Sequence, residues 1–442
     1  MSIVLWEVPN FVIDQQAIQN IDANTGELSI SFQGAGQSLG KLPLLFERNG
    51  QSIKVVNSWL IHLKANLRKK AVNTQAQGLL HYFTFLSEIE MTWDEMPVAI
   101  RLRPTYKFRK HLRDSYKSGS LARSTANSYM RVVISFYKFY LGRDYLFKNP
   151  PFKYEIVKID SENSHTYMRK SYLYVDTTDL RLSLPNDTSY YGLSRKLIPL
   201  NKEEWMVLEK HYKDLQRITL KTGSREKNIA ISKEFQIAIE LSRFSGLRRN
   251  EIITLRAKSI FKPSLEQLNK KYLIHTEGLN LDPRLGVETK NSSTRKAEIP
   301  TDLMQKLHEY VNSSRYINRK NLYITLNPDN KDNPPLLINQ NGYKYSASTL
   351  NARWGEIRSA IKNDMHSFDH KFHNLRSTYA VERLKELLNS GIKEGNALDY
   401  LQSVMGHKNR KTLLGYLKFC EEKINADEVH ESAISMLLSK GK

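Results

Sequence analysis

A glycine joins two segments of helical periodicity in Ser245-Gly246-Leu247-Arg248-Arg249-Asn250-Glu251-Ile252. The pattern predicts one helix over about 234–244, which ends at Gly246, and a second helix over 249–255. Arg248 is therefore expected directly after a turn and at a helix start. A single arginine in this position is usually an ordinary surface residue, so its meaning depends on the rest of the chain.

Three later segments carry side chains that fit the same kind of chemistry. They hold a lysine at a predicted hairpin, a histidine and an arginine three residues apart on one helix face, and a Gly-His pair followed nine residues later by a tyrosine. These residues are Lys290, His373, Arg376, His407 and Tyr416. Each segment alone is weak evidence, but their order along the chain is much less expected by chance.

The domain around these segments is predicted to cover residues 200–442 and to be mainly helical. Asn201, with Glu204 three residues later, matches the capping box that begins a helix. Short strands are expected over 272–275, 286–289 and 296–299, helices over 303–311, 348–361, 373–388, 397–405 and 411–419, and a C-terminal tail helix near 429–438.

The order Arg, Lys, His-x-x-Arg, Gly-His, Tyr resembles that of the tyrosine recombinase, or phage integrase, family. By motif the resemblance covers about 200–420, and it extends loosely to 53–150, which is similar to the family's helical core-binding domain. The family's catalytic positions would fall on Arg248, Lys290, His373, Arg376, His407 and Tyr416, with Lys296 as a rival for the lysine. The resemblance implies a mainly α fold with a small β-sheet in an α+β catalytic domain, and site-specific recombination of DNA.

The same residues support this chemistry on physical grounds. A tyrosine oxygen can displace the 5′-hydroxyl of a phosphodiester and keep the 3′-phosphate as an ester, which conserves the bond energy for rejoining. Ionising a tyrosine of pKa about 10 at pH 7 costs roughly 4 kcal/mol, and nearby cations can supply that energy. Arg248 and Arg376 would bind the non-bridging phosphate oxygens, and Lys290 would protonate the leaving oxygen. His373 and His407 would bind the phosphate or manage the proton of Tyr416, while Glu251 would orient an arginine.

The residues before the catalytic domain are predicted to form three parts. Residues 1–50 form an N-terminal extension with short strands, one of them at Ser29–Phe32. Residues 51–150 form a helical, DNA-binding domain of about four helices, the last beginning at Ser124 as N-cap. Residues 151–199 form a linker or insertion between this domain and the catalytic domain.

Composition limits the class of protein. The chain has 442 residues and a net charge of +21, which favours a polyanion partner. Its single cysteine excludes a disulfide framework and a cysteine-based zinc site. We expect a cytoplasmic, DNA-associated protein, because we find neither a secretory signal nor a run of about 18 apolar residues that could span a membrane.

The basic charge is concentrated in the second half of the helical domain. Residues 101–150 hold twelve Lys or Arg against two acidic residues. Single charges on helix faces are normally just solvated, but a local excess of ten is unfavourable unless a counter-charge is bound. We expect duplex DNA to be held here through its phosphates, with a homotetramer acting on two DNA sites and no cofactor or metal ion.

Three alternatives remain open at this level. His366, His370 and His373, with Asp369, could form a metal-binding helix face of a nuclease or hydrolase. The chain could instead be a DNA-binding relative that has lost its chemistry. It could also be a type IB topoisomerase, which uses the same tyrosine chemistry.

Overall fold

The computed structural model describes residues 3–21, 25–160, 172–185, 198–222, 225–270, 273–407 and 413–417. It divides into two compact units, Met1–Asn186 and Asp187–Lys442. Most of the described residues are helical and the strands form small antiparallel pairs, so the predicted fold class is confirmed. Among the helices described, none is long and apolar enough to cross a membrane.

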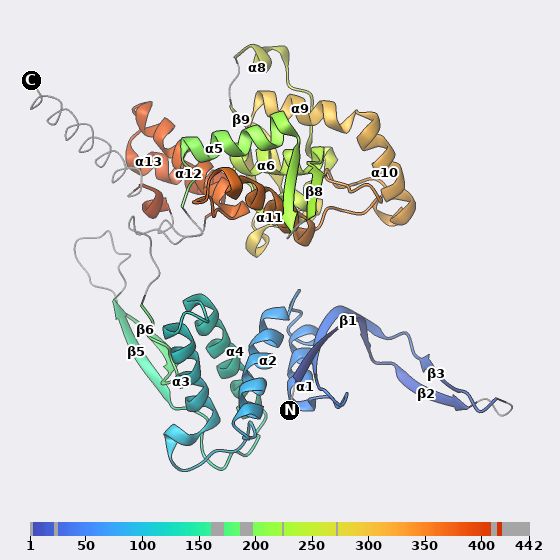
Figure 1. Ribbon diagram of the computed structural model, residues 1–442, viewed down its shortest axis with the longest axis vertical. Helices are drawn as coiled ribbons and strands as arrows, with labels where there is room; N and C mark the ends of the chain where they lie inside the picture. Colours follow the sequence, from blue (N-terminus) through green and yellow to red (C-terminus); the bar gives the residue numbers. More distant parts are fainter. Residues whose placement is uncertain are drawn as a thin grey trace, which may run out of the picture. The chain divides into compact units, whose positions relative to one another are not determined.

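The first unit combines a long strand pair with four helices (Figure 1). Strands β1 (Ile3–Ile13) and β4 (Gln37–Glu47) pair antiparallel, with Leu5 opposite Leu45. Between them, β2 (Gln16–Ile21) and β3 (Leu28–Gln33) form a two-stranded ribbon, which includes the predicted strand at Ser29–Phe32. The helices are α1 (Lys54–Ala65), α2 (Asn73–Glu88), α3 (Pro104–Lys117) and α4 (Arg123–Leu141).

Aromatic residues form much of the core of this unit. Tyr82 of α2 and Tyr137 of α4 are fully buried, and their hydroxyls are hydrogen-bonded at 2.6 Å. Phe108 packs against the ring of Tyr82, and Trp59 belongs to the same buried cluster. The predicted cap at Ser124 is wrong, since the N-cap of α4 is Ala122, two positions earlier, and no side chain caps the helix.

A strand pair lies in the segment predicted to be a linker or insertion. Strands β5 (Tyr154–Asp160) and β6 (Tyr172–Thr178) pair antiparallel, and the next residues pack into the core of the first unit through Leu180, Leu182 and Leu184. The chain between 151 and 185 therefore belongs structurally to the first unit as far as it is described.

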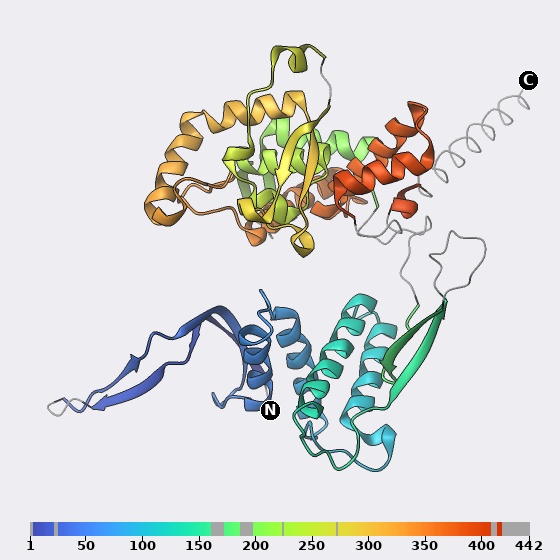
Figure 2. The same ribbon diagram turned by 180° about the vertical axis from the view of Figure 1, so that it is seen from behind.

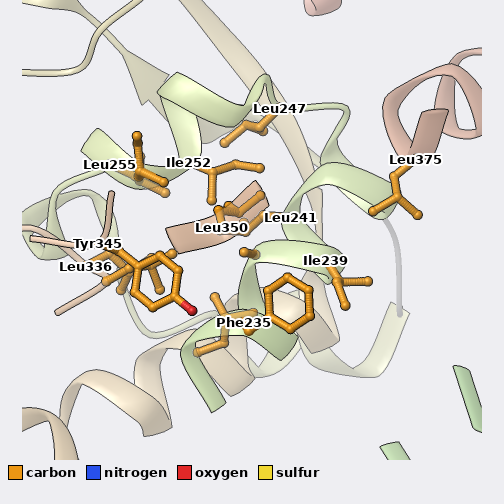
Figure 3. Close-up of a cluster of buried hydrophobic side chains, with 14 of the residues drawn as sticks. Phe235, Ile239, Leu241, Leu247, Ile252, Leu255, Leu336, Tyr345, Leu350 and Leu375 are labelled. Atoms are coloured by element: carbon orange, nitrogen blue, oxygen red, sulfur yellow. The ribbon is translucent and has the colours of Figure 1, made fainter. Parts of the chain in front are cut away.

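The second unit is built around α6 (Lys233–Ser245), whose residues are buried on nearly all sides. Figure 3 shows Phe235, Ile239 and Leu241 of this helix among apolar residues of neighbouring segments. The other main helices are α5 (Lys202–Glu209), α7 (Arg249–Thr254), α8 (Leu265–Lys270), α9 (Thr301–Val311), α10 (Ser314–Leu326), α11 (Ala347–Asp364), α12 (Phe372–Asn389) and α13 (Glu394–Met405). The capping box of Asn201 and Glu204 is present at the start of α5, as predicted.

Two strand pairs complete the second unit. Strands β9 (Leu273–Leu281) and β10 (Arg295–Pro300) pair antiparallel, as do β7 (Arg217–Thr222) and β8 (Arg225–Ala230). Shorter elements are η1 (Ile100–Leu102), η3 (Lys210–Leu215), η4 (Ala257–Ser259), η5 (Pro283–Leu285), η6 (Lys290–Ser292) and η7 (Pro328–Asn330). The strand predicted at 286–289 does not form.

A side chain explains that missing strand. The backbone N–H of Glu288 donates to the hydroxyl of Thr254 at 2.8 Å, so a side chain takes the place of a strand partner. Gly286 has a left-handed backbone (φ 86°) that ends η5. Within the last predicted helix, 411–419, the structure describes the helical residues 413–417, and the tail helix near 429–438 lies outside the described residues.

Candidate active site

Arg248 is positioned by the turn between α6 and α7. Gly246 has φ 61°, and a Cβ at this position would lie 2.4 Å from a ring carbon of Tyr379, so only glycine fits. The Arg248 guanidinium donates to Glu251 Oε1 at 3.0 Å and to the carbonyl of Gly406 at 2.9 Å. Glu251 Oε2 also accepts the backbone N–H of Arg248, at 2.7 Å. Glu251 therefore orients Arg248, as the sequence suggested.

Glu251 also binds a second arginine, which the sequence analysis missed. Arg295, the first residue of β10, donates to both carboxylate oxygens at 2.7 Å. The side chain of Glu251 is completely buried and that of Arg295 nearly so. Burial alone would raise the pKa of Glu251, but the hydrogen bonds and charge of Arg295, with the charge of Arg376, lower this pKa to about 2.

Arg295 could have been found from the strand period. Residues 295, 297 and 299 share one face of the strand and are buried, Lys296 between them is exposed, and Ala297 and Ile299 are plainly core residues. An arginine on that buried face must find an anionic or carbonyl partner. Lys296, the rival for the family's lysine, is exposed on the alternate face.

Arg376 lies in the first turns of α12 and is 1% exposed. Its guanidinium donates to the carbonyl of Met405 at 2.6 Å and to that of Gly246. Two carboxylates that could have paired with it have other partners, because Glu382 accepts from Arg243 and Asp369 from Lys362. Burial and the charges of Arg248 and Arg295 lower the pKa of Arg376 to about 9, so it remains a cation at pH 7.

The three arginines meet at the carboxyl end of α13. Its last carbonyls accept one guanidinium each, from Arg295 to Val404 (2.9 Å), from Arg376 to Met405 and from Arg248 to Gly406. Such carbonyls have no partner within a helix and carry the negative end of its dipole, so cations stabilise them. The arrangement fixes the position of the residue that follows, which is His407.

His407 is turned toward this cluster by Gly406. That glycine has φ 62°, and a Cβ there would approach the Arg295 side chain to 2.8 Å. The Nδ1 atom of His407 is buried and has no hydrogen-bond partner among the described residues. Burial, followed by the charges of Arg376, Arg248, Arg295 and His373, lowers the pKa of His407 to about 3, so its ring is neutral at physiological pH.

Tyr416 lies in the helical segment 413–417 and is 1% exposed. Its hydroxyl is hydrogen-bonded to the hydroxyl of Ser377 at 3.2 Å. Burial raises the pKa of Tyr416, whereas the bond to Ser377 and the charges of Arg376 and Arg248 act in the opposite direction. The tyrosine is thus placed within the field of two of the predicted arginines.

The remaining two predicted residues are less closely tied to this group. His373 is exposed at the start of α12 and is near enough to affect the pKa of His407. Lys290 is exposed in η6, in the connection between β9 and β10, and no hydrogen bond or ion pair joins its side chain to another described residue. The structure brings together Arg248, Arg376, His407 and Tyr416, and His373 lies at the edge of this group.

The cluster has an excess of positive charge. Glu251 is the carboxylate that binds Arg248 and Arg295, whereas Arg376 donates to carbonyls. With His407 neutral, two guanidinium charges in this buried group are not balanced by a carboxylate described here. Desolvated charge of this kind favours binding of an anion.

The histidines of the metal-binding alternative do not share a helix face. His366, Asp369 and His370 precede α12, which begins at Phe372. His366 Nδ1 lies 2.8 Å from the carbonyl of Lys362, and His370 pairs with Glu204 at 3.0 Å. Among the described residues, no group of three or more His, Cys, Asp or Glu is placed to hold a metal ion.

No family model matches the chain, and no curated protein matches it. It is similar to the solved Tn1549 transposon integrase in complex with transposon right end DNA, with 17% identity, a TM-score of 0.47, and coverage of 82% of this chain and 93% of that one. It is also similar to the XerH site-specific recombinase bound to a palindromic difH substrate, with 16% identity, a TM-score of 0.49, and coverage of 84% and 82%.

Proposed function

We propose that this chain is a site-specific recombinase that cleaves and rejoins duplex DNA, with Tyr416 as the nucleophile. The observation that carries the proposal is the group of three arginines held by the carbonyls at the end of α13, two of which, Arg376 and Arg248, act on the Tyr416 hydroxyl. A scissile phosphate is an anion that such a group would bind, and its phosphorus would then lie within reach of a tyrosine oxygen.

Each step of the reaction has a residue to perform it. The Tyr416 oxygen attacks phosphorus, the bond from phosphorus to the 5′-oxygen breaks, and a 3′-phosphotyrosyl ester remains. Arg248 and Arg376 stabilise the charge on the non-bridging oxygens in the transition state. Lys290 gives its proton to the leaving 5′-oxygen, and its exposed position in a turn leaves it free to approach DNA. Rejoining is the reverse, with the 5′-hydroxyl attacking the ester.

The histidines assist the phosphate and the tyrosine proton. A neutral His407 can accept a proton or donate a hydrogen bond, and the phosphate charge would offset the arginine field that lowers its pKa. Ionisation of a tyrosine with an ordinary pKa costs roughly 4 kcal/mol at pH 7. Burial raises the pKa of Tyr416 further, and the charges of Arg376 and Arg248 offset part of that added cost. No step requires a metal ion in this proposal.

The proposal assigns a role to each part of the chain. Residues 51–150 hold the duplex through its phosphates, residues 200–442 cleave it, and 151–199 connect the two. Strand exchange between two DNA sites requires four cleavages, so the active assembly is a homotetramer on two sites. The residues beyond Tyr416 dock on a neighbouring protomer in this proposal, and a chain that ends after Glu422 is expected to lose cooperative assembly.

The decisive experiment is trapping of the covalent intermediate on a nicked suicide substrate. The unmodified chain should form a protein–DNA adduct in the presence of a chelator, and Tyr416→Phe should not. Tyr400→Phe is the matched control, since Tyr400 belongs to the same unit and bonds Glu298 rather than the arginine cluster. An adduct that persists in Tyr416→Phe contradicts the proposal.

Adduct trapping, together with a DNA relaxation assay, distinguishes this proposal from two other hypotheses, a DNA-binding relative without chemistry and a type IB topoisomerase. A DNA-binding relative without chemistry would form no adduct with any variant. A topoisomerase would relax supercoiled DNA without preference for a site, whereas the proposed recombinase forms adducts preferentially at its own sites.

A further inference from the structure

The β2–β3 ribbon presents an apolar face to solvent. In its antiparallel register Ala17 lies opposite Phe32, Gln19 opposite Ile30 and Ile21 opposite Leu28, so these pairs share one face. Their large side chains are strongly exposed, at 71% for Ile21, 60% for Leu28, 55% for Ile30 and 65% for Phe32. The other face carries Gln16, Asn20, Ser29, Ser31 and Gln33 along with Ile18.

The ribbon does not bury this face against its own unit. It extends away from helices α1 to α4 in both views (Figures 1 and 2). All residues of β3 are exposed, and in β2 Ile18 alone is partly covered. Four large apolar side chains in a row are more than the scattered apolar residues of an ordinary surface, and they mark an interaction site.

The charge of this part of the chain identifies the kind of partner. Residues 1–40 contain four acidic residues (Glu7, Asp14, Asp22 and Glu27) and no lysine or arginine. A contact with nucleic acid needs cations for the phosphates, so the ribbon is unsuited to DNA. An anionic membrane surface is excluded for the same reason. The partner is therefore a protein, and one with a basic surface.

This chain itself has that surface. All 67 of its Lys and Arg follow residue 40, against 42 of its 46 Asp and Glu. The negative charge of residues 1–40 is therefore complementary to the net positive charge of the rest of the chain. Two-stranded ribbons also leave both edges open, and this one lacks the lysines and prolines that usually protect an edge from pairing with another chain.

We infer that the β2–β3 ribbon docks on a second copy of this chain, with Ile21, Leu28, Ile30 and Phe32 buried in the contact. Asp14 before β2 and Glu27 before β3 are exposed, and their carboxylates orient the ribbon toward basic residues of the partner copy, whereas Glu7 is paired with Lys41. The contact requires no DNA and no strand cleavage, so it can hold even where the proposed chemistry fails.

The test measures self-association of the full chain by analytical ultracentrifugation over a range of concentrations. The unmodified chain should associate, and Ile30→Thr with Phe32→Thr should weaken the association by at least about tenfold, since buried aromatic and aliphatic anchors dominate interfaces. Threonine preserves strand propensity. Ser29→Thr with Ser31→Thr, on the opposite face, is the matched control and should associate like the unmodified chain.

A photo-crosslinking amino acid in place of Phe32 identifies what the ribbon touches. In a mixture of isotopically labelled and unlabelled chains, crosslinks should join one isotope form to the other. Crosslinks confined to a single chain would mean that the ribbon folds back on its own second unit, and crosslinks to added DNA would mean a nucleic-acid contact; either result overturns the inference. It is also overturned if the unmodified chain stays monomeric, or if both double variants behave alike.

Discussion

The arginines and lysines of α3 and α4 mostly extend into solvent, whereas Arg248, Arg295 and Arg376 are packed inside the second unit. Lys110, Arg113 and Lys117 of α3 are exposed, and their spacing places them on one face of the helix. Exposed charges act over a distance and are screened by salt. The buried guanidiniums are instead fixed in direction by carbonyls and by Glu251, which suits them to a single phosphate.

Within the basic region, residues 101–150, some arginines are exposed to solvent, whereas others donate hydrogen bonds to carbonyls of the protein. Arg103 is buried and donates to the carbonyls of Pro97, Val98 and Pro150. Arg123 donates to the carbonyl of Leu184 at 2.9 Å. A count of basic residues therefore overstates the charge available to the proposed DNA partner, since some of these residues hydrogen-bond loop carbonyls.

The largest expected effect follows from Arg248→Lys. A lysine cannot bind Glu251, Gly406 and a phosphate at once as the planar guanidinium can. The rate of adduct formation should fall by about 100- to 1000-fold, the range for loss of one preorganised donor, while DNA affinity stays within about twofold. Single-turnover cleavage and binding titrations measure both. Arg249→Lys, at the partly exposed neighbouring position where the arginine bonds Asn250, should leave both unchanged, and equal losses in the two variants would contradict the comparison.

Replacement of the carboxylate should reduce stability. Glu251→Gln breaks a buried pair with Arg295 and should lower the free energy of unfolding by about 3–5 kcal/mol. Chemical denaturation measures the change, and Glu386→Gln, on an exposed pair with Arg383, should cost less than about 1 kcal/mol. A loss in Glu251→Gln no larger than in this control would contradict the role of the buried pair.

The unmodified chain should lose stability in acid for the same reason. The pKa of Glu251 is about 2 in the folded protein, below its ordinary value of 4.5. The contribution of ionised Glu251 to the free energy of unfolding is present above pH 4.5 and is lost as pH falls toward 2. It amounts to on the order of 3 kcal/mol in total. His407 acts in the same direction, because its ring stays neutral in the fold down to about pH 3 while the unfolded chain takes up a proton near pH 6.5. Unfolding at a series of pH values checks the slope, which should flatten in Glu251→Gln.

A smaller effect is expected from Ser377→Ala. The hydrogen bond of Ser377 lowers the pKa of Tyr416, so its removal raises that pKa and shifts the alkaline rise of the cleavage rate to higher pH. A neutral hydrogen bond of about 1 kcal/mol corresponds to roughly a fivefold slower rate at neutral pH. Ser390→Ala, at the exposed end of the same helix, should leave the pH profile unchanged. An identical pH profile in the unmodified chain, Ser377→Ala and Ser390→Ala would mean that Ser377 does not influence the ionisation of Tyr416.

The smallest effect per residue is expected on α3. Lys110→Gln, Arg113→Gln and Lys117→Gln should each lower the slope of log affinity against log salt by about one and leave cleavage of saturating DNA unchanged. Arg103→Gln should behave differently, with a loss of stability and little change in slope, because this arginine serves carbonyls rather than phosphates. Salt titrations and thermal unfolding separate the two outcomes.

Sequence reasoning succeeded where local signals were strong. Gly246 and Gly406 each end a helix in a left-handed conformation, and the spacing of His373 and Arg376 matches one helix face, so the segments that meet could be predicted. Arg295 was missed because it enters from a strand and is defined by a contact 44 positions away, with Glu251. Ser377 was missed because a serine after an arginine has no distinctive pattern. The strand at 286–289 was wrong because Thr254 captures its backbone N–H.

The central claim is that Tyr416 attacks a phosphate bound by the buried arginines. The most direct measurement is mass spectrometry of the trapped protein–DNA adduct after digestion in the presence of a chelator. The account predicts one modified peptide, in which the nucleotide is joined through its 3′-phosphate to the oxygen of Tyr416. A nucleotide attached to another residue, attached through a 5′-phosphate, or absent once divalent ions are removed would contradict it.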